Sequence, residues 1–291
     1  MGKASKRHSV RQSGAAPAPL ASRPFEGLAG ETEWVALREI VPAATGVVRF
    51  ADGKAPADAP VEATMATVLP MAWPALHRND GAVFVSTQAG PTCGDASRDI
   101  AAAWLLAAQA PVGFPIPQVP TATSTIPRLQ ELLDPAEPFE LTIQESFDFW
   151  VGDAEVDDSG RDSIKRATDS IVPTVRVQGA PSVFWVDFGQ RTFVRWVLPY
   201  AEDTATDGLA RLMAAGAAKL TDDSRLLGAF RACGLLVPVW EVPHGTTAHE
   251  YAAPLAALAP RITEAIDSTE PLTAEQRRAR SGLVSRQVTL R

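Results

Sequence analysis

Apolar side chains recur every three or four positions in several stretches of the chain, which is the repeat of an α-helix that buries one face. This pattern predicts helices at residues 31–41, 95–109, 126–133, 204–216, 225–233 and 247–267. Two of them begin with residues suited to cap the first turn: Asp95 precedes the second helix, and Thr247 lies three positions before Glu250 in the last. Such helices need a sheet or other helices to cover their apolar faces.

Short runs of β-branched and aromatic residues alternate with these helices and predict strands. Gly189 and Gln190 separate two such runs and suit a tight turn, which predicts a hairpin. The Asn-Asp-Gly sequence of residues 79–81 predicts a second hairpin turn. The runs are residues 61–69, 82–88, 139–151, 183–188, 191–198 and 235–242. The expected hairpins join residues 61–69 to 82–88 and residues 183–188 to 191–198.

The order of these elements predicts an α+β fold with two lobes. Residues 152–170 contain six acidic side chains and few apolar ones, a composition typical of an exposed linker. We therefore expect a first lobe over residues 24–151 and a second over residues 171–267. Each lobe repeats the order strand, strand, helix, helix, strand. A tandem duplication would explain this repeat, and so would coincidence in an α+β chain of this length.

The C-terminal residues 268–291 predict one more helix and an extended, arginine-bearing tail. Thr273 and Gln276 have the spacing of a helix cap, and Gly282 is suited to end the helix. Residues 283–291 mix apolar side chains with arginines. We expect this tail either to dock on the acidic body of the protein or to present its arginines to a partner.

The net charge of −7 is unevenly distributed along the 291 residues. The first 23 residues carry five lysine or arginine side chains and no acidic one, so the rest of the chain is more acidic than the total suggests. An acidic body disfavours binding to nucleic acid and to anionic lipid. We expect residues 1–23 to be a disordered basic tail, which is either solvated or in contact with a polyanion such as RNA.

The sequence predicts a cytoplasmic protein without a membrane span, metal or cofactor. The longest apolar stretch, residues 101–108, has about half the length that a membrane-spanning helix needs. Cys93 and Cys233 are too few for a disulfide framework or a four-thiolate zinc site, which favours a reducing cytoplasm. The glycine patterns of phosphate-binding loops and of dinucleotide-binding folds do not occur in the sequence.

Several runs of the sequence resemble an uncharacterised family of actinobacterial proteins of about this length. They are Pro-Phe-Glu-Gly-Leu at residues 24–28, the helix of residues 34–42, Arg-Trp-Val-Leu-Pro-Tyr at residues 195–200, and residues 272–291. The resemblance implies a bacterial cytoplasmic setting and no assigned catalytic residues. Residues 209–239 also resemble, in their apolar pattern alone, the N-terminal domain of SseB-type "enhanced serine sensitivity" proteins.

Cys93 is the candidate nucleophile of the sequence. It lies just before the helix predicted at residues 95–109, where the helix dipole and free N–H groups favour a thiolate. The neighbouring Asp95 opposes this effect, because a negative charge raises the pKa of a thiol. The spacing of the four histidines identifies none as a partner base. Cys93 is therefore a weak catalytic candidate, with an ordinary turn residue as the alternative.

The hairpin of residues 183–198 is the candidate contact surface, because both of its faces carry large apolar side chains. Helices would cover one face, and a second sheet or a partner protein would cover the other. The candidate binding residues in and after this hairpin are Trp185, Arg195, Trp196, Tyr200 and Asp203.

Two functional hypotheses follow from these patterns. The first is a non-enzymatic interaction or accessory protein that binds an unknown protein partner through the hairpin and the tails. The second is a small-molecule enzyme or ligand-binding protein with a pocket between the lobes, which uses Cys93 or the group of Arg195, Tyr200 and Asp203. An exposed aromatic patch would favour the first hypothesis, and a deep polar cleft would favour the second.

Overall fold

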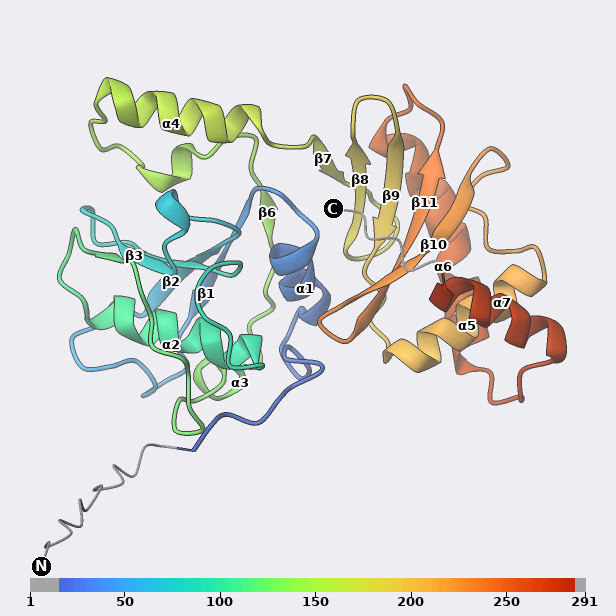
Figure 1. The fold of residues 1–291 in the computed structure, drawn as a ribbon, viewed down its shortest axis with the longest axis horizontal. Helices are drawn as coiled ribbons and strands as arrows, with labels where there is room; N and C mark the ends of the chain where they lie inside the picture. Colours follow the sequence, from blue (N-terminus) through green and yellow to red (C-terminus); the bar gives the residue numbers. More distant parts are fainter. Residues whose placement is uncertain (1–15, 286–291) are drawn as a thin grey trace, which may run out of the picture.

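The chain folds into an α+β structure with two β-sheets, which confirms the predicted fold class (Figure 1). The coordinates are those of a computed structural model that describes residues 16–285. One sheet has six strands from the first half of the chain, and the other has five strands within residues 174–242. The two sheets lie side by side, and helices pack on each of them (Figure 1).

The first sheet mixes parallel and antiparallel neighbours in the order β5-β3-β4-β2-β1-β6. Strands β2 and β4 run parallel, whereas the other neighbours are antiparallel. The strands are β1 (Ala44–Arg49), β2 (Glu62–Ala66), β3 (Ala75–His77), β4 (Val83–Ser86), β5 (Pro115–Ile116) and β6 (Thr142–Ile143).

The predicted hairpin between residues 61–69 and 82–88 is wrong, although its turn is correct. Gly81 has a φ of 85° in this turn, and the N–H of Arg78 bonds the carbonyl of Ala82 at 2.8 Å. The turn joins β3 to β4, because the short 3-10 helix Pro70–Ala72 carries the chain from β2 to the far side of β4. The 3-10 helix and β3 lie between β2 and β4 in the sequence, so the chain is long enough to return and run parallel to β2.

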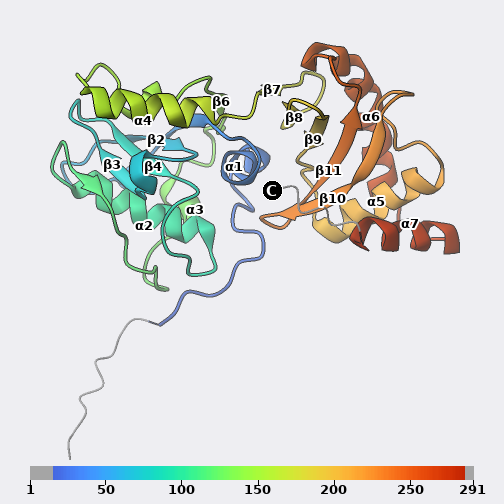
Figure 2. The same cartoon turned by 45° about the horizontal axis from the view of Figure 1, so that its top comes forward.

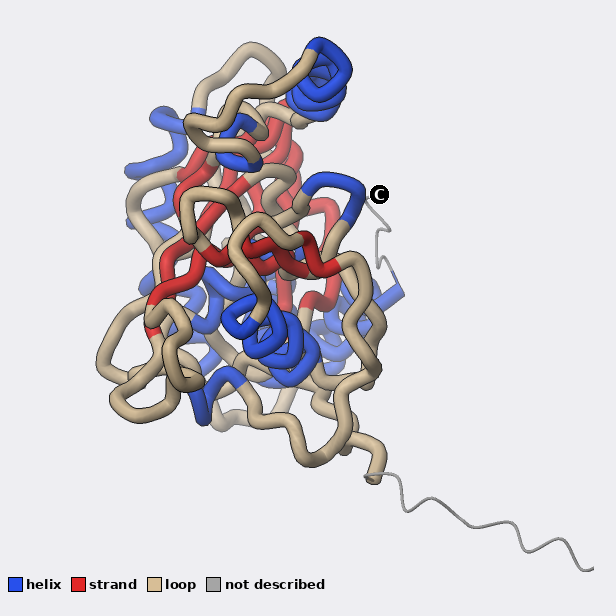
Figure 3. The backbone as a smooth tube through the Cα atoms, turned by 90° about the vertical axis from the view of Figure 1, so that its left-hand side faces the viewer, coloured by secondary structure: helices blue, strands red, loops and turns tan. Residues whose placement is uncertain are grey.

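Helix α2 (Ala96–Gln109) covers one face of the first sheet, with the short α3 (Leu129–Leu132) beside it (Figures 1 and 3). The apolar face of the helix predicted at residues 95–109 is buried in α2, since Trp104 and Ala107 are 0 % exposed. Trp104 stacks on Phe50 with ring centroids 3.7 Å apart. Burial of this ring pair anchors α2 to the first sheet.

An aromatic turn, rather than the strand predicted over residues 139–151, packs on the opposite face of the first sheet. Only Thr142–Ile143 pairs with the sheet, and Asp148–Trp150 forms a 3-10 turn. Phe149 of this turn lies 6.5 Å from Phe84 of β4, measured between ring centroids. The aromatic residues that suggested a strand therefore pack on the sheet from a loop.

The acidic segment of residues 152–170, predicted as a linker, contains a helix, α4 (Asp158–Asp169). Asp157 caps the helix by accepting a hydrogen bond of 2.8 Å from the N–H of Gly160. None of the helix residues is buried, and their charges pair along the helix, as Lys165 and Asp169 do at 2.7 Å. This exposed helix lies on the side of the first sheet opposite to α2 (Figures 1 and 3).

The second sheet is antiparallel throughout, in the order β10-β11-β9-β8-β7. The hairpin of β8 and β9 confirms the prediction from Gly189 and Gln190, and Gly189 has a φ of 82°. The strands are β7 (Thr174–Arg176), β8 (Val183–Asp187), β9 (Thr192–Trp196), β10 (Arg225–Ala232) and β11 (Leu235–Val242).

The helix predicted over residues 225–233 is wrong, because these residues form strand β10. They pair with β11 along their whole length, and Cys233 and Gly234 form the turn with φ values of 46° and 82°. A short apolar run suits a buried strand as well as a helix. Pairing with the buried β11 decides between the two.

Three helices pack on the outer face of the second sheet, which is the face turned away from the first sheet (Figure 1). The caps at Thr247 and Thr273 are confirmed by hydrogen bonds of their N–H groups to Glu250 and Gln276. The last helix continues beyond Gly282, and the predicted tail lies largely in residues 286–291, outside the described residues. The helices are α5 (Glu202–Ala214), α6 (Ala252–Asp267) and α7 (Ala274–Ser285).

Helix α1 (Glu31–Glu39) lies between the two sheets (Figure 2). Its Trp34 is 0 % exposed and stacks on Phe139 with ring centroids 4.0 Å apart. The same buried cluster contains Phe184 and Val186 of β8 in the second sheet. We call the face that carries these two residues the inner face. The lobes therefore share apolar core through α1.

Two further expectations change with the structure. The ββααβ repeat is wrong for the second lobe, because strands β10 and β11 follow α5. Part of the predicted basic tail belongs to the fold: Pro17 pairs with Thr123, and the N–H of Ala21 bonds the carbonyl of Gly94 at 2.9 Å. The expected disorder of residues 1–15 lies outside the described residues.

Candidate functional site

The candidate residues of the hairpin lie on opposite faces of the second sheet. Trp196 is 4 % exposed and, with the partly buried Trp185, packs into the core under α5 and α6. Arg195 lies on the inner face, because its neighbours across the strands are Phe184 of β8 and Val239 of β11. Side chains alternate between the faces of a strand, so Arg195 and the two tryptophans do not form one surface.

Tyr200 and Asp203 hold helices in place at the outer side of the second lobe. The Tyr200 hydroxyl is 3.0 Å from that of Thr263 on α6. Asp203 accepts a hydrogen bond of 2.9 Å from Arg280 of α7, which also donates to Asp207 at 2.6 Å. These residues do not join Arg195 in a single site.

The surroundings of Cys93 oppose its activation as a nucleophile. Burial raises the pKa of the Cys93 thiol, and the carboxylate of Asp99 raises it further. The Cys93 N–H donates to Asp99 at 3.1 Å, and the thiol is directed at the carbonyl of Asp95. The thiol is the stable form in this arrangement at neutral pH.

Arg195 and two phenylalanines form the most distinctive surface of the inner face. The guanidinium carbon of Arg195 lies 5.3 Å from the centre of the Phe188 ring, and Phe188 packs edge-on against Phe193 at 5.6 Å. Phe188 is 46 % exposed, whereas Arg195 is only 7 % exposed. We call Phe188, Arg191, Phe193, Arg195 and Glu241 the Arg195 patch.

The other cations of this surface have a common acidic partner. Arg191 donates to Glu241 at 2.8 Å, and Arg225 of the adjacent strand donates to the same carboxylate at 2.6 Å. These two guanidinium groups lower the pKa of Glu241 by hydrogen bonding to its charged form. Glu241 is therefore fully engaged by its two arginines.

Arg195 lacks such a partner among the described residues. Its Nε is buried without a hydrogen bond, and its only charge-related contact in this part of the chain is with the Phe188 ring. Burial lowers the pKa of Arg195, because removal from water disfavours a charge that no anion balances. Buried cations in proteins are ordinarily paired, so Arg195 stands out as a candidate site for an anion.

A second polar group, not predicted from the sequence, joins the two lobes. The Glu33 carboxylate accepts hydrogen bonds from Arg176 of β7 at 2.6 and 2.9 Å and from the Ser182 hydroxyl at 2.5 Å. Burial alone would raise the pKa of Glu33, but the hydrogen bonds from Arg176 and Ser182 lower it overall. We call Glu33, Arg176 and Ser182 the inter-lobe cluster. An acidic residue next to Trp34 on a buried helix was the available sequence signal.

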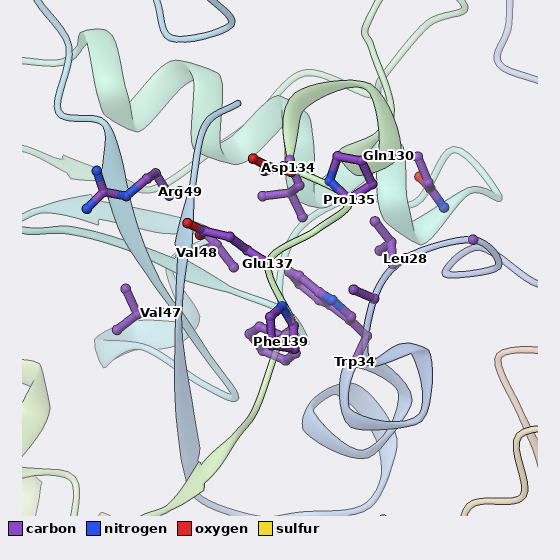
Figure 4. A pocket seen from close by; sticks show the side chains of 14 residues that line it. Leu28, Trp34, Val47, Val48, Arg49, Gln130, Asp134, Pro135, Glu137 and Phe139 are labelled. Atoms are coloured by element: carbon purple, nitrogen blue, oxygen red, sulfur yellow. The ribbon is translucent and has the colours of Figure 1, made fainter. Parts of the chain in front are cut away.

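Three of the cavities in the structure are shallow grooves. A groove of about 490 Å³ runs beside the inter-lobe cluster, and one of about 300 Å³ lies beyond it next to Thr168 and Thr174. Another groove of about 450 Å³ follows the exposed Val47 on the first sheet. The pocket in Figure 4, between α1 and the loop that contains Glu137, has a volume of only about 40 Å³. None of these four cavities is lined by Arg195.

Within residues 16–285, no three His, Cys, Asp or Glu side chains are grouped so that they could hold a metal ion. No helix in the described part of the chain is long and apolar enough to cross a membrane.

Comparison with known proteins places the chain in a family. Residues 24–291 match the sequence pattern of a family of unknown function, DUF5926. The chain belongs to this family. The match begins after the basic N-terminal segment, so that segment lies outside the family's pattern. No curated protein and no solved structure matches the chain, and the likeness to SseB-type proteins stays a prediction.

Proposed function

We propose that this protein is a non-enzymatic interaction protein that binds a protein partner through the Arg195 patch. The observation that carries the proposal is a half-exposed phenylalanine, Phe188, next to a buried arginine that has no ion pair with a described residue. Aromatic and arginine side chains are enriched in the centres of protein interfaces, where their large contact areas and directional hydrogen bonds contribute most of the affinity. This arrangement supports a contact surface at the tip of the β8–β9 hairpin.

We propose that the two lobes, residues 24–151 and 171–267, present this surface as a unit in the cytoplasm of a bacterium. The inter-lobe cluster and the shared core around Trp34 support a fixed arrangement of the lobes. Cys93 and Cys233 are both free thiols, which is the usual state of cysteines in a reducing compartment. The resemblance described above supports the bacterial setting.

The proposal is tested by quantitative affinity capture from a cytosolic extract of the source organism. Phe188→Ser removes the exposed ring of the patch, and Phe114→Ser is the matched control, because Phe114 is 58 % exposed on the first lobe. We expect one partner to bind the wild-type chain and the control and to be lost from Phe188→Ser. Capture that is the same for both variants, or the absence of any protein above background, would overturn the proposal.

A second candidate function is small-molecule binding between the lobes, which the groove of about 490 Å³ favours. The polar residues of that groove are Glu33 and Arg176, and they already bond each other. A ligand would have to compete with this pair, so we rank the function second. A thermal-shift screen of small cationic and anionic metabolites tests it, with Arg176→Gln expected to abolish any shift.

A further inference from the structure

The Arg195 patch and the adjacent Arg225 carry three guanidinium groups and one carboxylate, that of Glu241. Glu241 accepts hydrogen bonds from both Arg191 and Arg225, and elsewhere on the inner face Arg176 is paired with Glu33. Arg195 alone lies buried without a hydrogen bond or an ion pair to a described residue. Because an unbalanced buried charge is costly, its retention points to an anion that binds here.

The surroundings of Arg195 favour a carboxylate over a phosphate or a polyanion. A guanidinium group matches a planar carboxylate through two parallel N–H···O bonds. A phosphate group carries more charge and is held by several cations, whereas Arg191 and Arg225 are occupied by Glu241. The net charge of −7 also repels nucleic acids and other long polyanions.

The same surroundings favour a polypeptide over a free small molecule as the source of the carboxylate. None of the four cavities described above is lined by Arg195, so none of them would enclose a small acid bound to it. Phe188 offers an exposed ring next to the guanidinium, against which the apolar neighbours of an acidic residue could pack. One charged bond and an apolar contact together suit a segment of chain.

We infer that the Arg195 patch binds an acidic segment of a partner polypeptide, with one Glu or Asp carboxylate paired to Arg195 and an apolar side chain beside Phe188. This inference rests on the proposed function and specifies the chemistry of its partner. It assigns Arg195 the central role and leaves Arg225 at the rim, where its guanidinium already bonds Glu241.

A pair of synthetic peptides tests this chemistry on the full-length chain. The probes are acetyl-Ser-Leu-Glu-Leu-Ser-amide and the same peptide with Gln in place of Glu, titrated while the side-chain Nε–Hε signals of ¹⁵N-labelled arginine are recorded. We expect the Glu peptide to shift the Arg195 signal and to bind at least about tenfold more tightly than the Gln peptide, as loss of one charged bond predicts. Arg195→Gln abolishes this preference, and Arg225→Gln, the matched control, keeps it.

Other outcomes separate this inference from the proposed function. Equal binding of the two peptides, or a Glu preference that survives Arg195→Gln, overturns the inference. If inorganic phosphate or a short RNA shifts the Arg195 signal at lower concentration than the Glu peptide, the assigned chemistry is also wrong. After any of these outcomes, the affinity-capture experiment would still support the interaction surface if the Phe188→Ser variant no longer captured the partner. The melting temperature of the unbound Arg195→Met variant is a further check. Removal of an unbalanced buried charge should raise it, and a decrease would count against an unbalanced charge at this position.

Discussion

Replacement of Glu33 by Gln is expected to lower the stability of the whole protein, because it removes the charge at the centre of the inter-lobe cluster. The Glu33 side chain is almost fully buried, and its carboxylate accepts hydrogen bonds from Arg176, Ser182 and the N–H of Leu141. The glutamine amide has the same shape but only one acceptor oxygen. Arg176 would lose its counter-ion in a place where 30 % of its side chain still reaches water.

The size of the effect follows from these contacts. Removal of one partner of a buried ion pair costs about 3–5 kcal/mol. Because Arg176 is partly exposed and glutamine keeps part of the hydrogen bonding, we expect a loss of about 2–3 kcal/mol in the free energy of unfolding. For a domain of ordinary size this corresponds to a decrease of about 5–10 °C in melting temperature.

The assay is urea unfolding followed by tryptophan fluorescence, and Glu62→Gln is the matched control. Glu62 also pairs with an arginine, Arg49, but both side chains are more than half exposed. Exposed pairs contribute about 1 kcal/mol or less, so the control should unfold close to the wild type. Equal stability of Glu33→Gln and Glu62→Gln would refute the reasoning.

Acid titration gives an independent check of the same prediction. The pKa of Glu33 is lowered in the folded state, so this group stabilises the fold above its unfolded pKa of about 4.3. The contribution is lost as the pH falls through the lower, folded-state value. The difference in unfolding free energy between wild type and Glu33→Gln should therefore be full at pH 7 and shrink below about pH 4. A difference that stays constant down to pH 3 would contradict this assignment.

Three further predictions concern other parts of the molecule. The thiol of Cys93 should titrate at or above the ordinary value of about 8.5, and a value below about 7 from the pH dependence of alkylation would restore the catalytic hypothesis. Gly208→Ala should lower the melting temperature, although alanine favours helices, because a Cβ there would lie 2.9 Å from the backbone of Ile266. An unchanged melting temperature would show that α5 and α6 can move apart without a loss of stability. Limited proteolysis should cut first at residues 152–157, the exposed segment before α4, and first cuts within β8 or β9 would contradict the two-lobe arrangement.

Local signals in the sequence predicted the features that depend on neighbouring residues. The β8–β9 turn and the caps at Thr247 and Thr273 follow from residues within three positions of one another. Strand β10 was missed because a short apolar run does not distinguish helix from strand until its partner is known. The parallel pairing of β2 with β4 depends on the crossover through residues 67–82, which no local pattern in these residues specifies.

The candidate site was predicted in part. Alternation along β9 places Arg195 on the face opposite Trp196, and this could be inferred from the sequence. The burial of Arg195 without an ion pair to any described residue depends on more than this alternation, because Glu241 and the core around α1 come from distant parts of the chain. The inter-lobe cluster was out of reach for the same reason, since Arg176 is 143 residues from Glu33.

The measurement that tests the central claim most directly is site-specific photo-crosslinking in living cells. A benzoylphenylalanine placed at position 188 reports what touches the Arg195 patch, and the same group at position 114 reports the background at a phenylalanine that is also about half exposed. Position 188 should crosslink to one protein, at a segment that contains Glu or Asp, and the crosslink should disappear with Arg195→Gln. Identical crosslinking at positions 188 and 114, or a crosslink that persists in Arg195→Gln, would contradict the role assigned to the patch.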